Sequence, residues 1–133
     1  MYTGRHVVFE LYVHLVFVTK YRRGVITDRV RSALESNMHD ICLKFECELL
    51  EFDGEDDHVH LLVKYPTKVA LSKLVNSLKG ASSRVIRKME FPEVKRALWG
   101  GAFWSPSYCA VSCGGAPLKV VKQYIQNQRT RGG

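Results

Sequence analysis

The chain has 133 residues, of which 46% are hydrophobic and 25% are charged. We expect one globular domain over residues 1–133, without membrane association, because no apolar run approaches the roughly 20 residues that a membrane-spanning helix needs. Lys and Arg number 20 against 13 Asp and Glu, and the net charge of +7 favours an anionic partner, nucleic acid first.

The first predicted element is a long strand from His6 to Thr19, because apolar and polar residues alternate along it. Side chains alternate across a strand, so one face is apolar and the other carries Glu10, Tyr12 and His14. The apolar face consists of Val7, Phe9, Leu11, Val13, Leu15 and Phe17. Polar residues interrupt the apolar stretch and no small-residue cleavage site accompanies it, so we predict an intracellular, cytoplasmic protein rather than a secreted one.

A basic turn and then a helix follow this strand. Arg22 and Arg23, in the turn from Lys20 to Gly24, are candidates for contacting DNA phosphates, and a solvated loop explains the same residues equally well. The helix is predicted from about Asp28 to about Lys44, with Thr27 or Asp28 as its N-cap.

Two further strands are predicted to pair as an antiparallel hairpin, because they follow one another closely. The first runs from Phe45 to Phe52 and is followed by Asp53-Gly54, a turn signal. The second begins near Asp56 and ends near Tyr65-Pro66.

A second helix is predicted after Thr67, which can cap it, and Phe91-Pro92 ends it. Its apolar side carries Leu71, Leu74, Val75, Leu78, Val85, Ile86 and Met89. The charged residues on its other side are all cations: Lys73, Lys79, Arg84, Arg87 and Lys88. Among these cations we expect DNA-phosphate contacts from Lys79, Arg84 and Arg87. Gly80 interrupts the helix and marks either close packing or a kink.

A fourth strand is predicted from Phe103 to Ser112, broken or bulged near Pro106. Gly114-Gly115 then precede a last helix from about Pro117 to about Arg129. The order of strands and helices is that of the split β-α-β pattern. We therefore predict an α+β fold: a ferredoxin-like or RRM-like four-stranded antiparallel sheet with helices on one face, plus a C-terminal helix. The other face of the sheet is left for function.

The third strand carries the most informative motif, His58-Val59-His60. Its apolar residues are predicted to face the core, so the two histidines share the opposite face with Cα atoms roughly 6.5–7 Å apart. From there two ring nitrogens can converge on one metal ion, and two polar residues on a solvated face would show the same pattern. Asp57 either orients the ring of His58 or simply ends the loop.

The last helix carries Tyr124 and Gln128, which lie four residues apart and hence on one face. An amide oxygen from Gln128 is a reasonable third ligand beside the two histidines, and this donor set suits a Mg²⁺ or Mn²⁺ ion that also holds a phosphate. Tyr124, one helical turn away, would face that phosphate and can act as a covalent nucleophile. Taken alone, a tyrosine at helical spacing is more often a core residue.

Together these motifs resemble the single-tyrosine HUH (histidine–hydrophobic–histidine) transposases of the smallest insertion sequences, the IS two-hundred-like family. The similarity covers almost the whole chain. The motifs that carry it are Tyr21-Arg22-Arg23, Asp57-His58-Val59-His60, Ser77-Leu78-Lys79-Gly80 with Ser82-Ser83-Arg84, Phe103-Trp104 and Tyr124-Ile125-Gln126-Asn127-Gln128.

The resemblance implies an enzyme that cleaves and rejoins single-stranded DNA at insertion-sequence ends, next to imperfect hairpins. Tyr124 would attack the scissile phosphate and leave a 5′-phosphotyrosine link and a free 3′-OH. Mg²⁺ or Mn²⁺ would be held by His58, His60 and Gln128. A homodimer is implied in which the mobile tyrosine helix, residues 117–129, completes the site of the other subunit, and Gly114-Gly115 suit the hinge. Transesterification conserves the phosphodiester energy, so no nucleotide cofactor is expected.

The sequence is also compatible with three other functions. These are a domesticated or replication-type HUH endonuclease, a non-catalytic nucleic-acid-binding module of the same fold, and a small metal-dependent hydrolase that uses water as its nucleophile. Tyr12 and Trp104 either stack on DNA bases or belong to the core. The four cysteines form no C-x-x-C pair, so buried free thiols are expected: Cys42, Cys47, Cys109 and Cys113.

Overall fold

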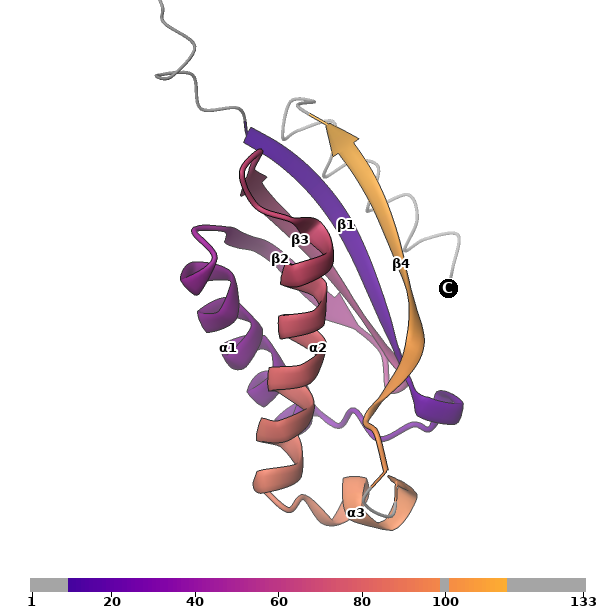
Figure 1. Cartoon of the computed structure of the whole chain (residues 1–133). Coiled ribbons are helices and arrows are strands. Elements are labelled where there is room, and N and C mark those ends of the chain that lie inside the picture. The colour runs from indigo at the N-terminus through magenta and orange to yellow at the C-terminus, as the bar shows by residue number, and fades with distance from the viewer. Residues whose placement is uncertain (1–9, 99–100, 115–133) are drawn as a thin grey trace, which may run out of the picture.

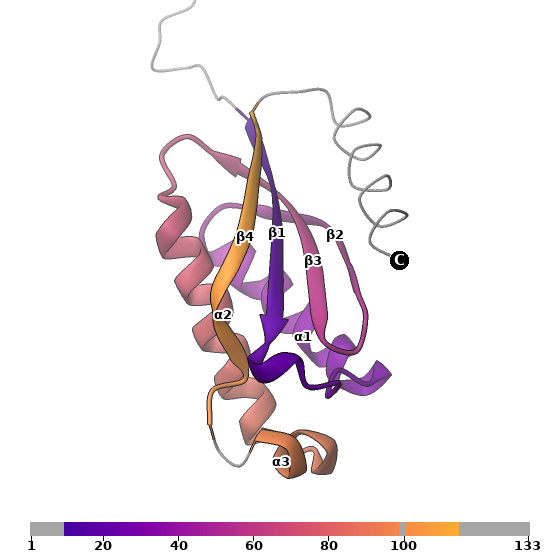
Figure 2. The ribbon, with the colours of Figure 1, turned by 90° about the vertical axis from the view of Figure 1, so that its right-hand side faces the viewer.

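The computed structural model describes residues 10–98 and 101–114, which form a four-stranded antiparallel sheet with two long helices on one face (Figure 1). The elements in chain order are β1 (Glu10–Thr19), a 3-10 turn η2 (Lys20–Arg22), α1 (Asp28–Lys44), β2 (Glu48–Gly54), β3 (His58–Pro66), α2 (Leu71–Lys88), α3 (Pro92–Leu98) and β4 (Trp104–Gly114). The strand order is β2-β3-β1-β4, which Figure 2 shows with the helices behind the sheet. This confirms the predicted fold class. The predicted C-terminal helix lies outside the described residues.

The core lies between the sheet and the two long helices. The strands contribute Val13, Leu15, Phe17, Val59, Leu61 and Val63, and the helices contribute Val30, Leu34, Met38, Leu74, Val75, Leu78 and Ile86. Each fully buried side chain of this size stabilises the fold by about 1.5–3 kcal/mol relative to its exposed state. The core face of β1 and β3 is therefore the predicted one, so His58 and His60 point to the face without α1 and α2.

The ends of α1 show one prediction confirmed and one wrong. Thr27 caps the helix, because its hydroxyl accepts a hydrogen bond from the Val30 amide at 3.4 Å. The segment from Phe45 to Cys47 is not strand, since the amide of Cys47 donates to the carbonyl of Cys42 at 2.8 Å and closes the helix. Glu46 takes a left-handed conformation there, with φ of 60°. The alternation of apolar residues in this segment reflects a helix end packed on the core.

The β2–β3 hairpin turns two residues later than predicted. Asp53 and Gly54 are the last residues of β2, and the turn consists of residues 55–57. A Cβ atom on Gly54 would lie 2.3 Å from the carbonyl oxygen of His58, so only glycine allows the two backbones to approach this closely. The glycine is thus needed for strand contact rather than for the turn. A bulge at Leu50 shifts the register between Leu49 and Glu51.

The second helical region also differs from the prediction. Thr67 lies in a turn, and α2 begins after Ala70 without a side-chain cap. The helix continues through Gly80, where an added Cβ would meet only the end of the Arg84 side chain at 3.4 Å, so neither close packing nor a kink explains this glycine. Met89 is 50% exposed rather than part of the apolar side. Pro92 begins the short helix α3, which the sequence did not predict.

The fourth strand has the predicted irregularity near Pro106, because Tyr108 and Trp104 pair with Phe17 and Thr19 across a register shift. The indole of Trp104 is buried and donates to the Ser82 hydroxyl at 2.9 Å. Tyr12 is buried as well. Trp104 belongs to the core, whereas Tyr12 is buried on the opposite face of the sheet, and neither ring is exposed for base stacking.

The cysteines follow the prediction only in part. Cys42 and Cys47 are buried free thiols, and burial raises their pKa values to about 12 and about 11. Cys109 is exposed on β4, where it pairs with Val16 on the sheet face turned away from α1 and α2. In the described part of the chain, no helix is long and apolar enough to cross a membrane.

Candidate active site

The paired histidines lie side by side on β3, as the alternation predicted. Their ring centroids are 4.9 Å apart and their planes meet at 78°. Both side chains are half-buried on the sheet face turned away from α1 and α2. The backbone of β2 approaches that of His58 closely at Gly54, and the amide of Glu55 donates to the carbonyl of His58 at 3.0 Å.

Asp57 orients the ring of His58. Its Oδ1 accepts a hydrogen bond from Nδ1 of His58 at 2.7 Å, and its Oδ2 lies 3.3 Å from Nε of Arg22. The hydrogen bond from His58, followed by the charge of Arg22, lowers the pKa of the Asp57 carboxyl. The backbone carbonyl of Asp57 accepts from the amide and the hydroxyl of Thr19 at 2.9 Å and 3.1 Å. Of the two interpretations of Asp57, the contact with the ring of His58 is the one observed.

The basic turn after β1 lies beside Asp57 and His58. The backbone takes left-handed conformations at Tyr21 and Arg22, with φ of 59° and 52°, and this turn brings the Arg22 guanidinium to the Asp57 carboxylate. Arg23, which follows, is exposed. The turn therefore places positive charge at the end of the sheet where His58 lies.

His14 also belongs to this site, although sequence reasoning assigned it no role. Its Nε2 lies 3.0 Å from Nδ1 of His60, and the two rings are nearly parallel, with centroids 5.2 Å apart and an angle of 13° between their planes. His14 is 4% exposed. On β1 and β3, His14 pairs with Leu62 and Val16 pairs with His60, so the two histidines are diagonal neighbours. Alternation places His14 on the correct face, but the register that brings it to His60 is not readable from the sequence.

The cations predicted on α2 are not brought to the histidines. Nζ of Lys79 donates to the carbonyls of Ser105 and Pro106 at 2.7 Å and 3.0 Å, which ties α2 to β4, and burial lowers its pKa. Arg84 and Arg87 line a groove between α1 and α2, on the helical side of the molecule. A DNA contact by these three residues stays a prediction, and any such contact by the two arginines would be on the opposite side of the sheet.

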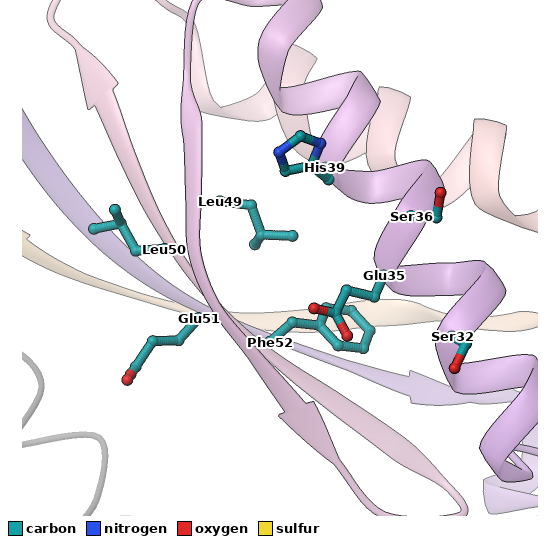
Figure 3. A pocket seen from close by; sticks show the side chains of 8 residues that line it. All are labelled: Ser32, Glu35, Ser36, His39, Leu49, Leu50, Glu51 and Phe52. Carbon is teal, nitrogen blue, oxygen red and sulfur yellow. The ribbon is translucent and has the colours of Figure 1, made fainter.

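A separate pocket lies between α1 and β2 (Figure 3). Glu35 and His39 of α1 face Leu49 and Phe52 of β2 there, whereas the side chain of Leu50 points away from α1. None of the residues predicted for the site lines this pocket. The pocket is therefore distinct from the histidine site.

The donor set at the histidines fits a divalent cation. Asp57 holds Nδ1 of His58 and His14 holds Nδ1 of His60, so Nε2 is the ring nitrogen suited to a metal in each. Glu55, which sequence reasoning missed, forms a second possible donor group with Asp57 and His58, whose ligand atoms lie within 4.8 Å of one another. Imidazole nitrogens with carboxylate oxygens suit a divalent metal ion. The acidic run before the histidine motif was the available signal for Glu55.

Comparison with known proteins identifies the family. A family model described as "Transposase IS200 like" matches residues 7–128. The chain belongs to this family. This transposase is 34% identical over 131 residues to the ISDra2 transposase TnpA of Deinococcus radiodurans. The aligned region covers 98% of this chain and 93% of that protein. It is 30% identical over 115 residues to the transposase for insertion sequence element IS200 of Salmonella typhimurium, covering 86% and 74% of the two chains.

Solved structures agree with this assignment. The fold is similar to the crystal structure of a Deinococcus radiodurans R1 protein assigned as a transposase, with a TM-score of 0.74 and 37% identity over 96% of this chain and 98% of that chain. It is also similar to a REP-associated tyrosine transposase bound to a REP hairpin, with a TM-score of 0.60 and 11% identity over 94% and 67% of the two chains. At that identity the second likeness concerns the fold alone. The family resemblance seen in the sequence is confirmed.

Proposed function

We propose that this transposase cleaves and rejoins single-stranded DNA at insertion-sequence ends through a 5′-phosphotyrosine intermediate on Tyr124. The observation that carries the proposal is the pair of histidine rings, oriented by Asp57 and His14, in a chain of the IS200-like family. Tyr124 and Gln128 lie outside the described residues, and their roles rest on their spacing in the sequence.

The proposed metal ligands are His58, His60 and Gln128, which suit Mg²⁺ or Mn²⁺. When bound, such an ion supplies charge stabilisation at the phosphoryl oxygens and at the leaving group. Asp57 keeps the His58 ring in one orientation and keeps its proton on Nδ1, because an ionised carboxylate can only accept. The carboxylates of Glu55 and Asp57 form an alternative donor set with His58.

The chemical step is a transesterification on phosphorus. The Tyr124 hydroxyl oxygen forms a bond to the scissile phosphorus, and the bond between that phosphorus and the 3′ oxygen breaks. The tyrosine loses its proton and the 3′ oxygen gains one, so the products are a 5′-phosphotyrosine link and a free 3′-OH. Attack by a 3′-OH on the phosphotyrosine reverses these bonds and joins strands. The number of phosphoester bonds is conserved throughout, which is why no nucleotide cofactor is required.

The proposed substrate is single-stranded DNA with hairpins near the cleavage point. A solved structure of similar fold is bound to a REP hairpin, and the net charge of +7 favours a polyanion. Arg22 and Arg23 lie at the histidine end of the sheet and are suited to neutralise phosphates there. Arg84 and Arg87, on the helical side, would meet a more distant part of the DNA. We extend the proposal to a homodimer in which residues 117–129 of one subunit complete the site of the other.

A denaturing-gel assay tests this function. The protein is incubated with a hairpin-bearing single strand and Mn²⁺, and a covalent protein–DNA adduct is expected for the unaltered chain and for the Tyr108→Phe control, whose tyrosine is 41% exposed on β4. Tyr124→Phe, or a chelator, abolishes the adduct. Cleavage that survives in Tyr124→Phe would indicate a hydrolase that uses water. Binding without any adduct in the unaltered protein would indicate a non-catalytic module.

A further inference from the structure

We propose that His14 is a positioning residue of the metal centre. In this role its Nε2 accepts a hydrogen bond from the N–H at Nδ1 of His60 and thereby fixes Nε2 of His60 as the atom that binds the metal. The inference rests on the proposed function, because it requires His60 to be a ligand. It adds a residue from β1, the central strand next to β3, to a site that the sequence located only on β3 and the last helix.

This role is supported by the short distance between the rings of His14 and His60, which lie on paired strands. Nε2 of His14 and Nδ1 of His60 lie 3.0 Å apart, within hydrogen-bond distance. The rings are nearly parallel, with an angle of 13°, and His14 is buried. Because the two residues lie on paired strands in the middle of the sheet, backbone hydrogen bonds set the position of one ring against the other.

The hydrogen bond selects a tautomer. A neutral imidazole carries a proton on one nitrogen and a lone pair on the other, so only one of the two facing nitrogens can donate. If His60 donates, its Nε2 carries the lone pair that a metal needs. If His14 donates, the proton of a neutral His60 sits on Nε2, and that nitrogen cannot be a ligand. Metal binding at Nε2 therefore requires His14 to accept, and the two ligand rings are then oriented alike, one by a carboxylate and one by a neutral ring.

Two measurements on the full chain test the role. Long-range proton–nitrogen NMR spectra of the metal-free protein report which nitrogen of His60 carries the proton, and we expect Nδ1. Electron paramagnetic resonance of free Mn²⁺ gives the metal affinity of each variant. We expect His14→Phe, which keeps a buried ring and removes the acceptor, to lower Mn²⁺ affinity about 10- to 100-fold, as is usual for partners of metal-binding histidines.

Matched variants separate positioning from packing. His14→Gln keeps an acceptor oxygen and is expected to lose less Mn²⁺ affinity than His14→Phe, while His39→Gln, at an exposed histidine of α1, leaves the affinity unchanged. Equal losses in the Gln and Phe variants, or no loss in His14→Phe, would overturn the inference. So would a proton on Nε2 of His60 in the unaltered metal-free protein, a result that does not depend on any variant folding.

A further variant distinguishes the failure of this inference from the failure of the proposed metal site. If His60→Ala lowers Mn²⁺ affinity while His14→Phe does not, the metal site stands and the role of His14 is refuted. If His60→Ala leaves Mn²⁺ affinity unchanged, the proposed metal site itself fails, and the role of His14 fails with it.

Discussion

Replacing Asp57 with asparagine should change the Mn²⁺ affinity of the protein much more than it changes the stability of the fold. Asparagine keeps the size of the side chain and the backbone carbonyl that binds Thr19, but it removes the charge that Oδ1 presents to His58 at 2.7 Å and Oδ2 presents to Arg22 at 3.3 Å. The pKa of Asp57 is lowered by these contacts, so the carboxylate is ionised at neutral pH and its loss is a full change of charge.

The expected magnitudes differ for affinity and stability. Loss of a partner that orients a metal-binding histidine costs about 10- to 100-fold in metal affinity, which corresponds to about 1.4–2.8 kcal/mol. The ion pair with Arg22 is solvent-exposed on the arginine side, and such pairs contribute only about 0–1 kcal/mol to folding. Asp57→Asn should therefore weaken Mn²⁺ binding strongly while changing the metal-free unfolding midpoint little.

Calorimetric titration with Mn²⁺, alongside thermal unfolding of the metal-free protein, measures both quantities. Asp56→Asn is the matched control, because Asp56 is the neighbouring exposed carboxylate and makes no hydrogen bond to a histidine among the residues that the structure describes. Unchanged Mn²⁺ affinity in Asp57→Asn would refute the orienting role. A loss of Mn²⁺ affinity in Glu55→Gln as large as that in Asp57→Asn would show instead that the acidic group itself binds the metal.

Three further predictions concern the scaffold. Ser82→Ala leaves the buried indole N–H of Trp104 without the acceptor that it has at 2.9 Å, so urea denaturation should show a loss of about 1–3 kcal/mol, and a neutral result would contradict the bond. The hydrogen bond from Arg29 lowers the pKa of Glu93 from 4.5 to about 2. The unaltered protein should therefore be more stable than Glu93→Gln above pH 4.5, and this difference should vanish as the pH falls toward 2. A difference in the free energy of unfolding that does not change with pH would contradict this. Alkylation at a pH near 9.0 should leave Cys42 unmodified, because burial raises its pKa to about 12. Mass spectrometry of the labelled protein measures this, and label on Cys42 of the folded protein would contradict the prediction.

Patterns with a fixed period were predictable from the sequence. The alternation along β1 and β3 identified the core face and the shared face of His58 and His60, and Thr27 was one of the two N-cap candidates for α1. These features depend on neighbours within a few residues, which a sequence displays directly. The adjacency of Asp57 to His58 belongs to the same class, although only the structure chose between its two interpretations.

Features that depend on contacts between distant segments were not predictable. The pairing of His14 with His60 depends on the register of β1 on β3, which no local pattern determines. Gly54 is a glycine because the backbone of His58 approaches it, not because it forms the turn that its sequence suggests. Helix α3 packs Val94 and Leu98 into the core, and its Glu93 binds Arg29 of α1 at 2.6 Å. These contacts are with distant segments, whereas a proline after a helix indicates from the sequence only that the helix ends.

The central claim is that Tyr124 becomes covalently joined to DNA. Trypsin should release Tyr124 in the peptide from Gln123 to Arg129, because Lys122 and Arg129 flank it. After reaction with a hairpin-bearing single strand and Mn²⁺, nuclease treatment and mass spectrometry should find this peptide enlarged by a 5′-phosphonucleotide on the tyrosine. A nucleotide on a different tyrosine, or a cut strand with this peptide unmodified, would contradict the account.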